Sequence, residues 1–264
     1  MSLRDRGNIL GVGVHALDLS RARDLVMERA RTGRGYVCFC DVNSLSCARR
    51  DPAHFAALNN AFLTTPDGMP VVWMMRRTGH RDVTRVYGPD LLLEICAASA
   101  GTELTHYFYG GGEGTAPALA AELQKRFPDL RIVGMDTPPF GEPDAAQASA
   151  LAQRTAALRP DFIWIGLSTP KQEKLMALTA PLIQHGVMLG VGAAFDFLSG
   201  RVRQAPRWMQ RSGLEWLFRL ASEPRRLAPR YFRNNPLFLV RAFAQLTGLK
   251  RYSEPARSGD ITRR

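Results

Sequence analysis

Over its first two hundred residues, the chain alternates between short apolar runs and segments with helical spacing. The apolar runs, which predict strands, are residues 12–17, 36–43, 106–110, 131–135, 161–166 and 187–192. The helical segments are 51–62, 89–100, 115–127 and 142–158, and another helix follows the first run and ends near Arg31. Strands that are apolar on both faces and alternate with helices are typical of a parallel sheet covered on both sides. The pattern therefore predicts an α/β fold with a mostly parallel sheet.

The pattern changes near Arg201, where tryptophans, arginines and prolines become frequent. Two amphipathic stripes follow, formed by Leu214, Leu217, Phe218 and Ala221 and then by Leu239, Phe243 and Leu246. Beyond Lys250 the chain is polar and is predicted to be disordered. We therefore expect a catalytic domain over 1–200, a helical appendage over 201–250 and a disordered tail over 251–264.

The charge of the chain is concentrated in this last quarter. The net charge is +11, and residues 201–264 contain 15 Lys and Arg against 4 Asp and Glu, which accounts for all of it. An excess confined to one segment indicates an acidic partner, either a nucleic acid or an anionic membrane surface.

Several kinds of segment and site are not expected. No apolar run reaches the length of about 18 residues that a transmembrane helix needs. The first ten residues lack the apolar core of a signal peptide, so a cytoplasmic location is predicted. The four cysteines form no CxxC pair and are interpreted as structural thiols, and the histidines have no partner at ligand spacing. No metal or other cofactor is predicted.

Polar loops follow several of the predicted strands. In open parallel sheets, ligands bind beyond the carboxyl ends of the strands. The loop residues at these ends are Asp41 and Asn43, Gly110, Gly111 and Gly112, Lys171 and Gln172, and Asp196. We expect these loops to lie along one edge of the sheet.

The glycine loop has two interpretations. Glycines let backbone N–H groups approach a phosphate at a helix N-terminus, but a plain strand-to-helix turn also favours them. The loop does not match GxGxxG, because Thr115 occupies the last glycine position. A rival match, GVGVHA at 11–16, falls within a predicted strand and is interpreted as chance.

Asp67, in the stretch TTPDGMPVVW, raises the question of why a carboxylate leads into an apolar run. It is either an Asp-Gly turn former or a residue at the edge of a site, because burying a carboxylate is costly unless it is paired or used. Taken singly, Arg85 is interpreted as a surface arginine and Gln172 as a polar helix-entry residue. These residues one by one do not decide the function.

An ordered series of motifs is more specific. TPDGMPVVW, RVYGPDLLLE, FYGGGEG with RFPDLRIVG, IGLSTPKQE and GVGAAFDFLSGRVRQAPRWMQRSGLEWLFRLASEPRRLAPRY occur in that order. Together they closely resemble the WecG/TagA/CpsF glycosyltransferases, from about residue 10 to residue 235. The TPDG motif and the stretch from GLEW to EPRRL are the most specific parts.

The resemblance implies an inverting, metal-independent transferase. Such an enzyme moves a sugar from a nucleotide donor, taken to be a UDP-sugar, onto a polyprenyl-diphosphate-linked sugar in the synthesis of bacterial surface polysaccharides. It also implies a Rossmann-like domain whose basic appendage meets the inner face of the cytoplasmic membrane and helps to complete the site. Self-association, which would cover the appendage, is a further implied property.

The resemblance assigns roles to particular residues. The TPDG aspartate, proposed as general base, falls on Asp67. The other family positions fall on Asn43, Arg85, Gln172 and Asp196, which would lie at the donor. One departure is that Asp41 stands where the family usually has threonine, which puts the identity of the donor sugar in doubt. For the diphosphate, the candidate arginines of the appendage are Arg219, Arg226 and Arg230, because guanidinium offers a bidentate fork.

Two other classes of protein would share some of these features. A nucleic-acid-binding α/β protein would also be basic, but no recognition motif or array of stacking aromatic residues is found. A nicotinamide-dependent oxidoreductase would share the sheet, but it should have GxGxxG after the first strand. The motif series therefore favours the glycosyltransferase, with no nucleic-acid partner.

Overall fold

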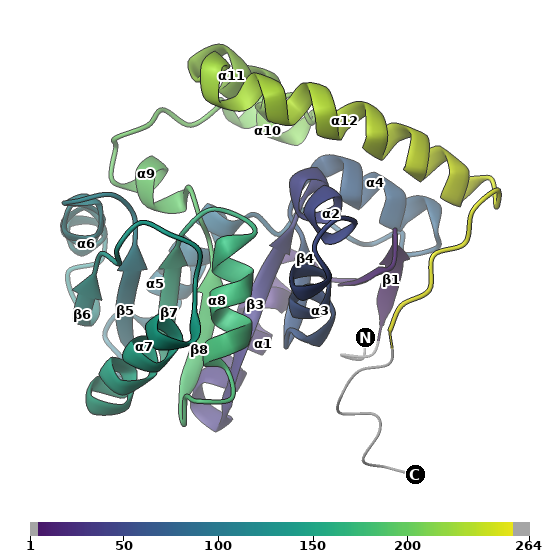
Figure 1. Ribbon diagram of the computed structural model, residues 1–264. Coiled ribbons are helices and arrows are strands. Elements are labelled where there is room, and N and C mark those ends of the chain that lie inside the picture. The colour runs from purple at the N-terminus through teal and green to yellow at the C-terminus, as the bar shows by residue number, and fades with distance from the viewer. Residues whose placement is uncertain (1–4, 256–264) are drawn as a thin grey trace, which may run out of the picture.

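The computed structural model describes residues 5–255 and contains one six-stranded parallel sheet. Its strands, in the spatial order β4-β3-β8-β7-β5-β6, confirm the predicted α/β fold. They are β3 (Arg34–Cys40), β4 (Leu63–Pro66), β5 (Thr105–Gly110), β6 (Arg131–Asp136), β7 (Phe162–Gly166) and β8 (Gly186–Gly190). All five neighbouring pairs are parallel, so the carboxyl ends share one edge of the sheet, which faces the C-terminal helices in Figure 1.

Helices cover both faces of the sheet, as the apolar runs predict. One face packs against α1 (Leu19–Thr32), α5 (Gly88–Ser99), α6 (Thr115–Arg126) and α9 (Ala194–Leu198). The other packs against α2 (Val42–Ala48), α3 (Pro52–Asn60), α7 (Ala145–Leu158) and α8 (Lys171–Thr179). In β3, Val37 and Phe39 enter the first core, whereas Cys38 and Cys40 enter the second. This alternation is the two-residue repeat of a strand.

The first predicted strand does not join this sheet. Residues Val12–His15 form β2, which pairs antiparallel with β1 (Arg6–Ile9) in a separate hairpin. Leu10 and Gly11 turn the chain between them with positive φ angles of 53° and 91°. The expectation that this run opens the parallel sheet was wrong, because β1 is short, contains Arg6 and Gly7, and gives little apolar signal.

The apolar run after Asp67 forms α4 (Met69–Arg77), an amphipathic helix. Val71, Val72 and Met75 are fully buried, whereas Trp73 is 46% exposed. The apolar run is therefore buried on one face of the helix only.

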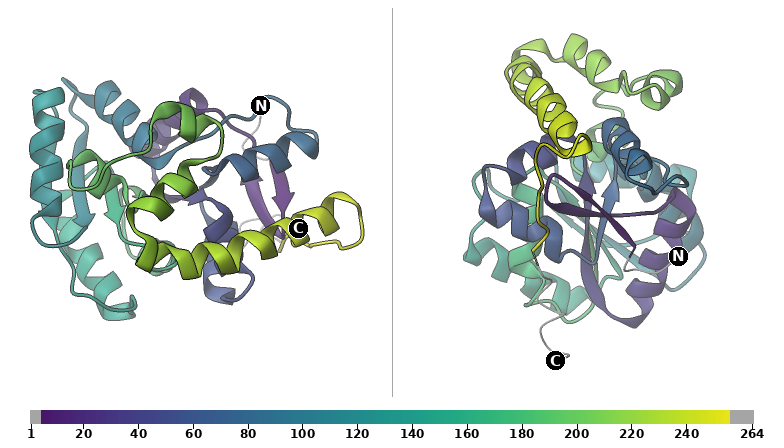
Figure 2. Two further views of the ribbon diagram at one scale, coloured as in Figure 1. Left: turned by 90° about the horizontal axis from the view of Figure 1, so that it is seen from above. Right: turned by 90° about the vertical axis from the view of Figure 1, so that its right-hand side faces the viewer.

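The appendage consists of three helices that lie above the carboxyl ends of the strands (Figures 1 and 2). They are α10 (Arg207–Arg211), α11 (Glu215–Ser222) and α12 (Pro224–Leu246). The helix α12 continues through Pro229 and Pro236, although proline inside a helix removes a backbone hydrogen bond. Among residues 5–255, no helix is both long and apolar enough to cross a membrane.

The chain after α12 returns toward the hairpin. The side-chain amide of Asn8 donates a hydrogen bond to the carbonyl oxygen of Tyr252 at 2.5 Å, and Arg49 lies over the Tyr252 ring. The rest of the predicted tail, 256–264, lies outside the described residues.

Candidate functional site

A cavity of about 880 Å³ lies between the carboxyl ends of β3 and β4 and the appendage. Its walls come from the loops after both strands, from α4 and from α10 to α12. Six residues singled out from the sequence line this cavity: Asp41, Asn43, Asp67, Arg85, Arg219 and Arg230. The site therefore combines residues that are more than 180 positions apart in the chain.

Asp67 is held at the point where β4 ends and α4 begins. Its backbone N–H donates to the carbonyl oxygen of Cys40 at 3.0 Å, which continues the pairing with β3. Gly68 is the N-cap of α4, so the carboxylate stands beside the partly positive end of that helix. The side chain is 20% exposed and lines the cavity. Asp67 thus lies in a turn and also at the wall of the cavity, and its role as a base stays a prediction.

Arg85 joins Asp67 to the appendage. Its Nη2 lies 3.2 Å from Oδ1 of Asp67 and 2.7 Å from Oε2 of Glu215 on α11. The hydroxyl of Tyr87 donates to the other oxygen of Glu215 at 2.8 Å, and the guanidinium lies 3.9 Å from the centre of the Tyr87 ring. These four residues form what we call the Arg85 cluster: Asp67, Arg85, Tyr87 and Glu215.

The electrostatics of the cluster favour a carboxyl group that can exchange a proton near neutral pH. Burial, together with the negative charges of Asp41 and Glu215, raises the pKa of Asp67 from 3.8 to about 7 against the opposing charge of Arg85. Burial acts to lower the pKa of Arg85, but Asp67 and Glu215 outweigh it, so the pKa of the guanidinium is raised and its charge is retained. A base whose pKa lies near the working pH is well matched to proton transfer.

Asp41 and Asn43 stand at the N-terminus of α2. Oδ1 of Asp41 accepts a hydrogen bond from the backbone N–H of Ser44 at 2.7 Å, so Asp41 is the N-cap of the helix. The amide of Asn234 on α12 donates to Oδ1 of Asn43 at 3.1 Å. The appendage therefore contacts a predicted donor-binding residue directly.

The remaining predicted residues lie outside the lining of this cavity. Gly110, Gly111 and Gly112 form the turn from β5 to α6. Asp196, on α9, is half-buried, and burial raises the pKa of its carboxyl group while Arg226 opposes this shift. Arg226 itself forms an ion pair with Glu223. The structure thus divides the predicted donor and diphosphate residues between the cavity and the neighbouring strand ends.

Gln172 is buried rather than exposed at the helix entry. Its Nε2 donates to the carbonyl oxygen of Gly190 at 2.6 Å and to Oε1 of Glu173 at 3.0 Å. This ties the start of α8 to the carboxyl end of β8.

Comparison with known proteins decides what kind of protein carries this arrangement. The family model of the glycosyl transferase WecG/TagA/CpsF family matches residues 7–252. The chain belongs to the WecG/TagA/CpsF family of glycosyltransferases. It is 29% identical over 177 residues, 67% of either chain, to the N-acetylglucosaminyldiphosphoundecaprenol N-acetyl-beta-D-mannosaminyltransferase of Bacillus subtilis (strain 168). The protein of the same name from Bacillus spizizenii is 28% identical over 179 residues, 68% of either chain.

Family membership makes this chain an enzyme that transfers a sugar. It therefore replaces the two alternatives considered from the sequence, the nucleic-acid-binding protein and the nicotinamide-dependent oxidoreductase.

Two members of the Arg85 cluster of this WecG/TagA/CpsF enzyme were not singled out as candidates from the sequence. Tyr87 follows Arg85 in RVYGPD, and Glu215 belongs to GLEW. Both motifs were recognised, but only Arg85 was singled out. The partners of Glu215 are more than 125 residues away in the chain, so no local spacing could reveal them.

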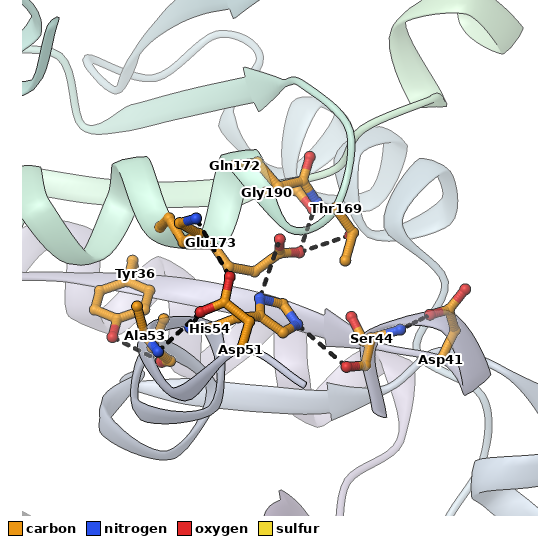
Figure 3. Close-up of polar contacts among 12 residues, drawn as sticks. Tyr36, Asp41, Ser44, Asp51, Ala53, His54, Thr169, Gln172, Glu173 and Gly190 are labelled. Atoms are coloured by element: carbon orange, nitrogen blue, oxygen red, sulfur yellow. Dashed lines mark hydrogen bonds and ion pairs between the residues drawn. The ribbon is translucent and has the colours of Figure 1, made fainter. Parts of the chain in front are cut away.

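Figure 3 shows a second buried group, around Glu173, that was not singled out from the sequence. Glu173 follows Gln172 in PKQE and is fully buried, and burial raises the pKa of its carboxyl group to about 7. Its Oε2 lies 3.8 Å from Nδ1 of His54, whose pKa burial lowers to about 4. The pair links α8 to α3, behind the N-terminus of α2.

Proposed function

We propose that this glycosyltransferase moves a sugar from a nucleotide-sugar donor onto an N-acetylglucosamine that is linked to a polyprenyl diphosphate. The names of the two Bacillus relatives support this acceptor, and the family resemblance supports a UDP-sugar donor. The observation that carries the proposal is Asp67, a carboxylate with a pKa near 7 at the wall of the large cavity.

The proposed step is a single displacement. Asp67 accepts the proton of an acceptor hydroxyl as its oxygen forms a bond to the anomeric carbon of the donor. The bond from that carbon to the nucleotide diphosphate breaks on the opposite face, and the diphosphate leaves with the bonding electrons. Configuration at the carbon is therefore inverted. A positioned base of this kind contributes about 10²–10⁴-fold to the rate.

Two diphosphates need positive charge in this proposal, that of the nucleotide-sugar donor and that of the lipid-linked acceptor. Arginines supply it. Arg85, Arg219 and Arg230 line the cavity, and a guanidinium binds phosphate oxygens through paired N–H groups. The family resemblance implies that no metal ion is needed, and the proposal includes none. Transfer should accordingly persist in excess chelator.

We further propose that the enzyme works at the inner face of the cytoplasmic membrane, in the synthesis of a cell-surface polysaccharide. The lipid-linked acceptor requires access to a bilayer. The appendage and the residues after it hold the whole net charge of +11, and Phe232, Phe243 and Leu249 are more than 60% exposed on the appendage. Basic side chains beside exposed apolar ones are suited to an anionic membrane surface.

The test compares wild type with Asp67→Asn and with Asp82→Asn, a matched change at an exposed carboxylate nearby. Nucleotide release is measured for a panel of UDP- and GDP-sugars, with and without a soluble analogue of the lipid-linked N-acetylglucosamine. Asp67→Asn should lose about 10²–10⁴-fold of the acceptor-dependent rate, whereas Asp82→Asn should lose none.

Folding is checked by urea denaturation of the same three proteins. Asp67→Asn leaves Arg85 paired with Glu215, so no buried charge is abandoned and the fold should persist. If Asp67→Asn instead unfolds the protein, the role of Asp67 is confined to the turn. If no donor gives acceptor-dependent release in wild type, the proposed function is wrong.

A further inference from the structure

The cavity beside Asp67 extends as an apolar groove between α4 and α12. Figure 2 shows these two helices on the same side of the molecule. We call this extension the α4–α12 groove. Its apolar lining includes Met69, Trp73 and Met74 from α4 and Phe238, Leu239, Ala242 and Leu246 from α12, and Arg77 at the C-terminal end of α4 lines the cavity beside them. The proposed reaction does not use any of these side chains.

The polarity of the lining changes along α12. The cavity residues of its first half are polar: Arg230, Tyr231, Asn234 and Asn235. Those of its second half, from Phe238 to Leu246, are all apolar. At a rise of about 1.5 Å per residue, the apolar stretch is about 12 Å long. One end of the space therefore suits a charged group, and the other suits hydrocarbon.

Contacts fix the α12 wall of the groove at the middle of the helix and near its C-terminal end. Asn234 donates to Asn43 at 3.1 Å beside the polar end. At the apolar end, Nε2 of Gln245 donates to the carbonyl oxygen of Asn8 at 2.7 Å, and its Oε1 accepts from the backbone N–H of Leu10 at 2.9 Å. Phe238 and Ala242 are also buried in the core of the body. These contacts position the wall of the groove without help from a bound molecule.

We propose that the α4–α12 groove binds the hydrocarbon chain of the acceptor, at the isoprene units next to the diphosphate. This inference rests on the proposed function, because the acceptor must be a lipid diphosphate. A molecule with its diphosphate near Arg219 and Arg230 and its chain along Phe238 to Leu246 matches the order of polar and apolar lining. The groove also begins at the carboxylate that would receive the proton, as an acceptor site must.

Leu239 and Val240 provide a matched pair of variants. They are neighbours on α12 and are 66% and 67% exposed, but only Leu239 lines the groove. Leu239→Gln puts an uncharged polar group into the groove, whereas Val240→Gln makes a similar change outside it. Because both sites are highly exposed, neither change should unfold the protein.

The experiment uses two soluble acceptors without membrane or detergent. Both carry N-acetylglucosamine diphosphate, one on a single isoprene unit and the other on a farnesyl chain. In wild type, kcat/KM should be roughly tenfold or more higher for the farnesyl acceptor, because additional CH₂ groups are buried. Leu239→Gln should lose most of this preference, and Val240→Gln should keep it.

A binding measurement separates failure of the groove from failure of the proposed function. Farnesyl diphosphate without sugar is titrated against the tryptophan fluorescence of wild type, with Trp73→Phe to assign the signal. Saturable binding that Leu239→Gln weakens and Val240→Gln does not supports the groove even if no acceptor is glycosylated.

Three outcomes would overturn the inference. One is an equal kcat/KM for both acceptors in wild type, and another is an equal loss in both variants. The third is a dimer, seen by sedimentation without lipid, that Leu239→Gln alone dissociates, because a second copy of the chain would then occupy the groove.

Discussion

Asp41 shows how one residue can serve the fold and the site together. It caps α2 through Ser44, and its carboxylate also lines the cavity and raises the pKa of Asp67. Threonine, which the family resemblance implies at this position, is also a good N-cap but carries no charge. The departure seen in the sequence therefore preserves the helix start and adds a negative charge beside the proposed base.

The pH dependence of activity should reflect this charge. A base must be unprotonated, so kcat/KM of the wild type should rise with pH and level off above the Asp67 pKa of about 7. Asp41→Thr removes a neighbouring negative charge, which lowers the pKa of Asp67, so the midpoint of the rise should move to lower pH. Measurement of kcat/KM from about pH 5 to about pH 9 tests this.

Asp41→Ala is the variant that separates the helix-capping role of Asp41 from the effect of its charge. It should move the midpoint as Asp41→Thr does and should also cost about 1 kcal/mol of unfolding free energy. An unchanged midpoint in both variants would mean that Asp67 does not limit the pH profile.

Residues of the site could be predicted from sequence when their own surroundings were unusual. Asp67 was conspicuous as a carboxylate that leads into an apolar run. Glu215 and Glu173 were not, because what distinguishes them is a distant partner: Arg85 for Glu215 and His54 for Glu173. Such contacts have no local period or composition by which sequence alone could find them.

At the scale of elements, backbone geometry explains part of the glycine content of the turn from β5 to α6. Gly110 has a φ of 129°, and a Cβ there would lie 2.7 Å from the backbone of Gly166 on β7. Gly111 and Gly114 also have positive φ angles, of 74° and 70°. A close approach of two strand ends therefore requires glycine here, and the phosphate-binding interpretation of the loop stays a prediction.

Gly110→Ala should lower the free energy of unfolding by about 2 kcal/mol or more, because it combines strained φ with a backbone clash. Gly141→Ala is the control, since a Cβ there meets nothing within 4 Å. That change should stay within about 0.5 kcal/mol of wild type. Urea denaturation of both variants gives the comparison, and equal stabilities would contradict the role assigned to Gly110.

Elements with a long apolar period were predicted well, and short or proline-containing ones were not. Five of the six strands of the main sheet follow their predicted apolar runs closely, but the short edge strand β4 (Leu63–Pro66) was missed. The hairpin strand β1 has four residues and no clear period. In α12, the prolines obscured a continuous helix, which contacts to Asn43 and Asn8 hold at its middle and near its C-terminal end.

The whole molecule divides into a body without net charge and a strongly basic appendage. This division could be predicted from the distribution of charge along the chain, and the α/β fold from the pattern of apolar runs. The boundaries at 200 and 250 and the disorder of the end of the chain stay predictions, as does self-association. What composition could not predict is that the appendage enters the site, through Glu215 at Arg85 and Asn234 at Asn43.

Membrane attachment is a property of the whole molecule, and it should depend on the appendage. Wild type should sediment with anionic vesicles, less at high salt, because each basic residue near the surface contributes about 1 kcal/mol. Phe243→Ser should weaken this binding, since Phe243 is 63% exposed on α12. Phe140→Ser should not, although Phe140 is fully exposed on the body.

Phe243 is not part of the lining of the α4–α12 groove, so this test is independent of the acceptor chain. Equal sedimentation of wild type and Phe243→Ser would remove this part of α12 from the membrane contact. Equal weakening by the two changes would indicate that the body also attaches.

The contacts of Glu215 with Arg85 and Tyr87 also limit how such enzymes can be recombined. A chimaera that joins this body to the appendage of another glycosyltransferase would take the Glu215 carboxylate away from Arg85 and Tyr87, unless the grafted α11 carried one at the same place. Although the two parts differ in charge and composition, they are not interchangeable modules. Exchange between relatives, in evolution or in engineering, has to move Arg85, Tyr87 and Glu215 together.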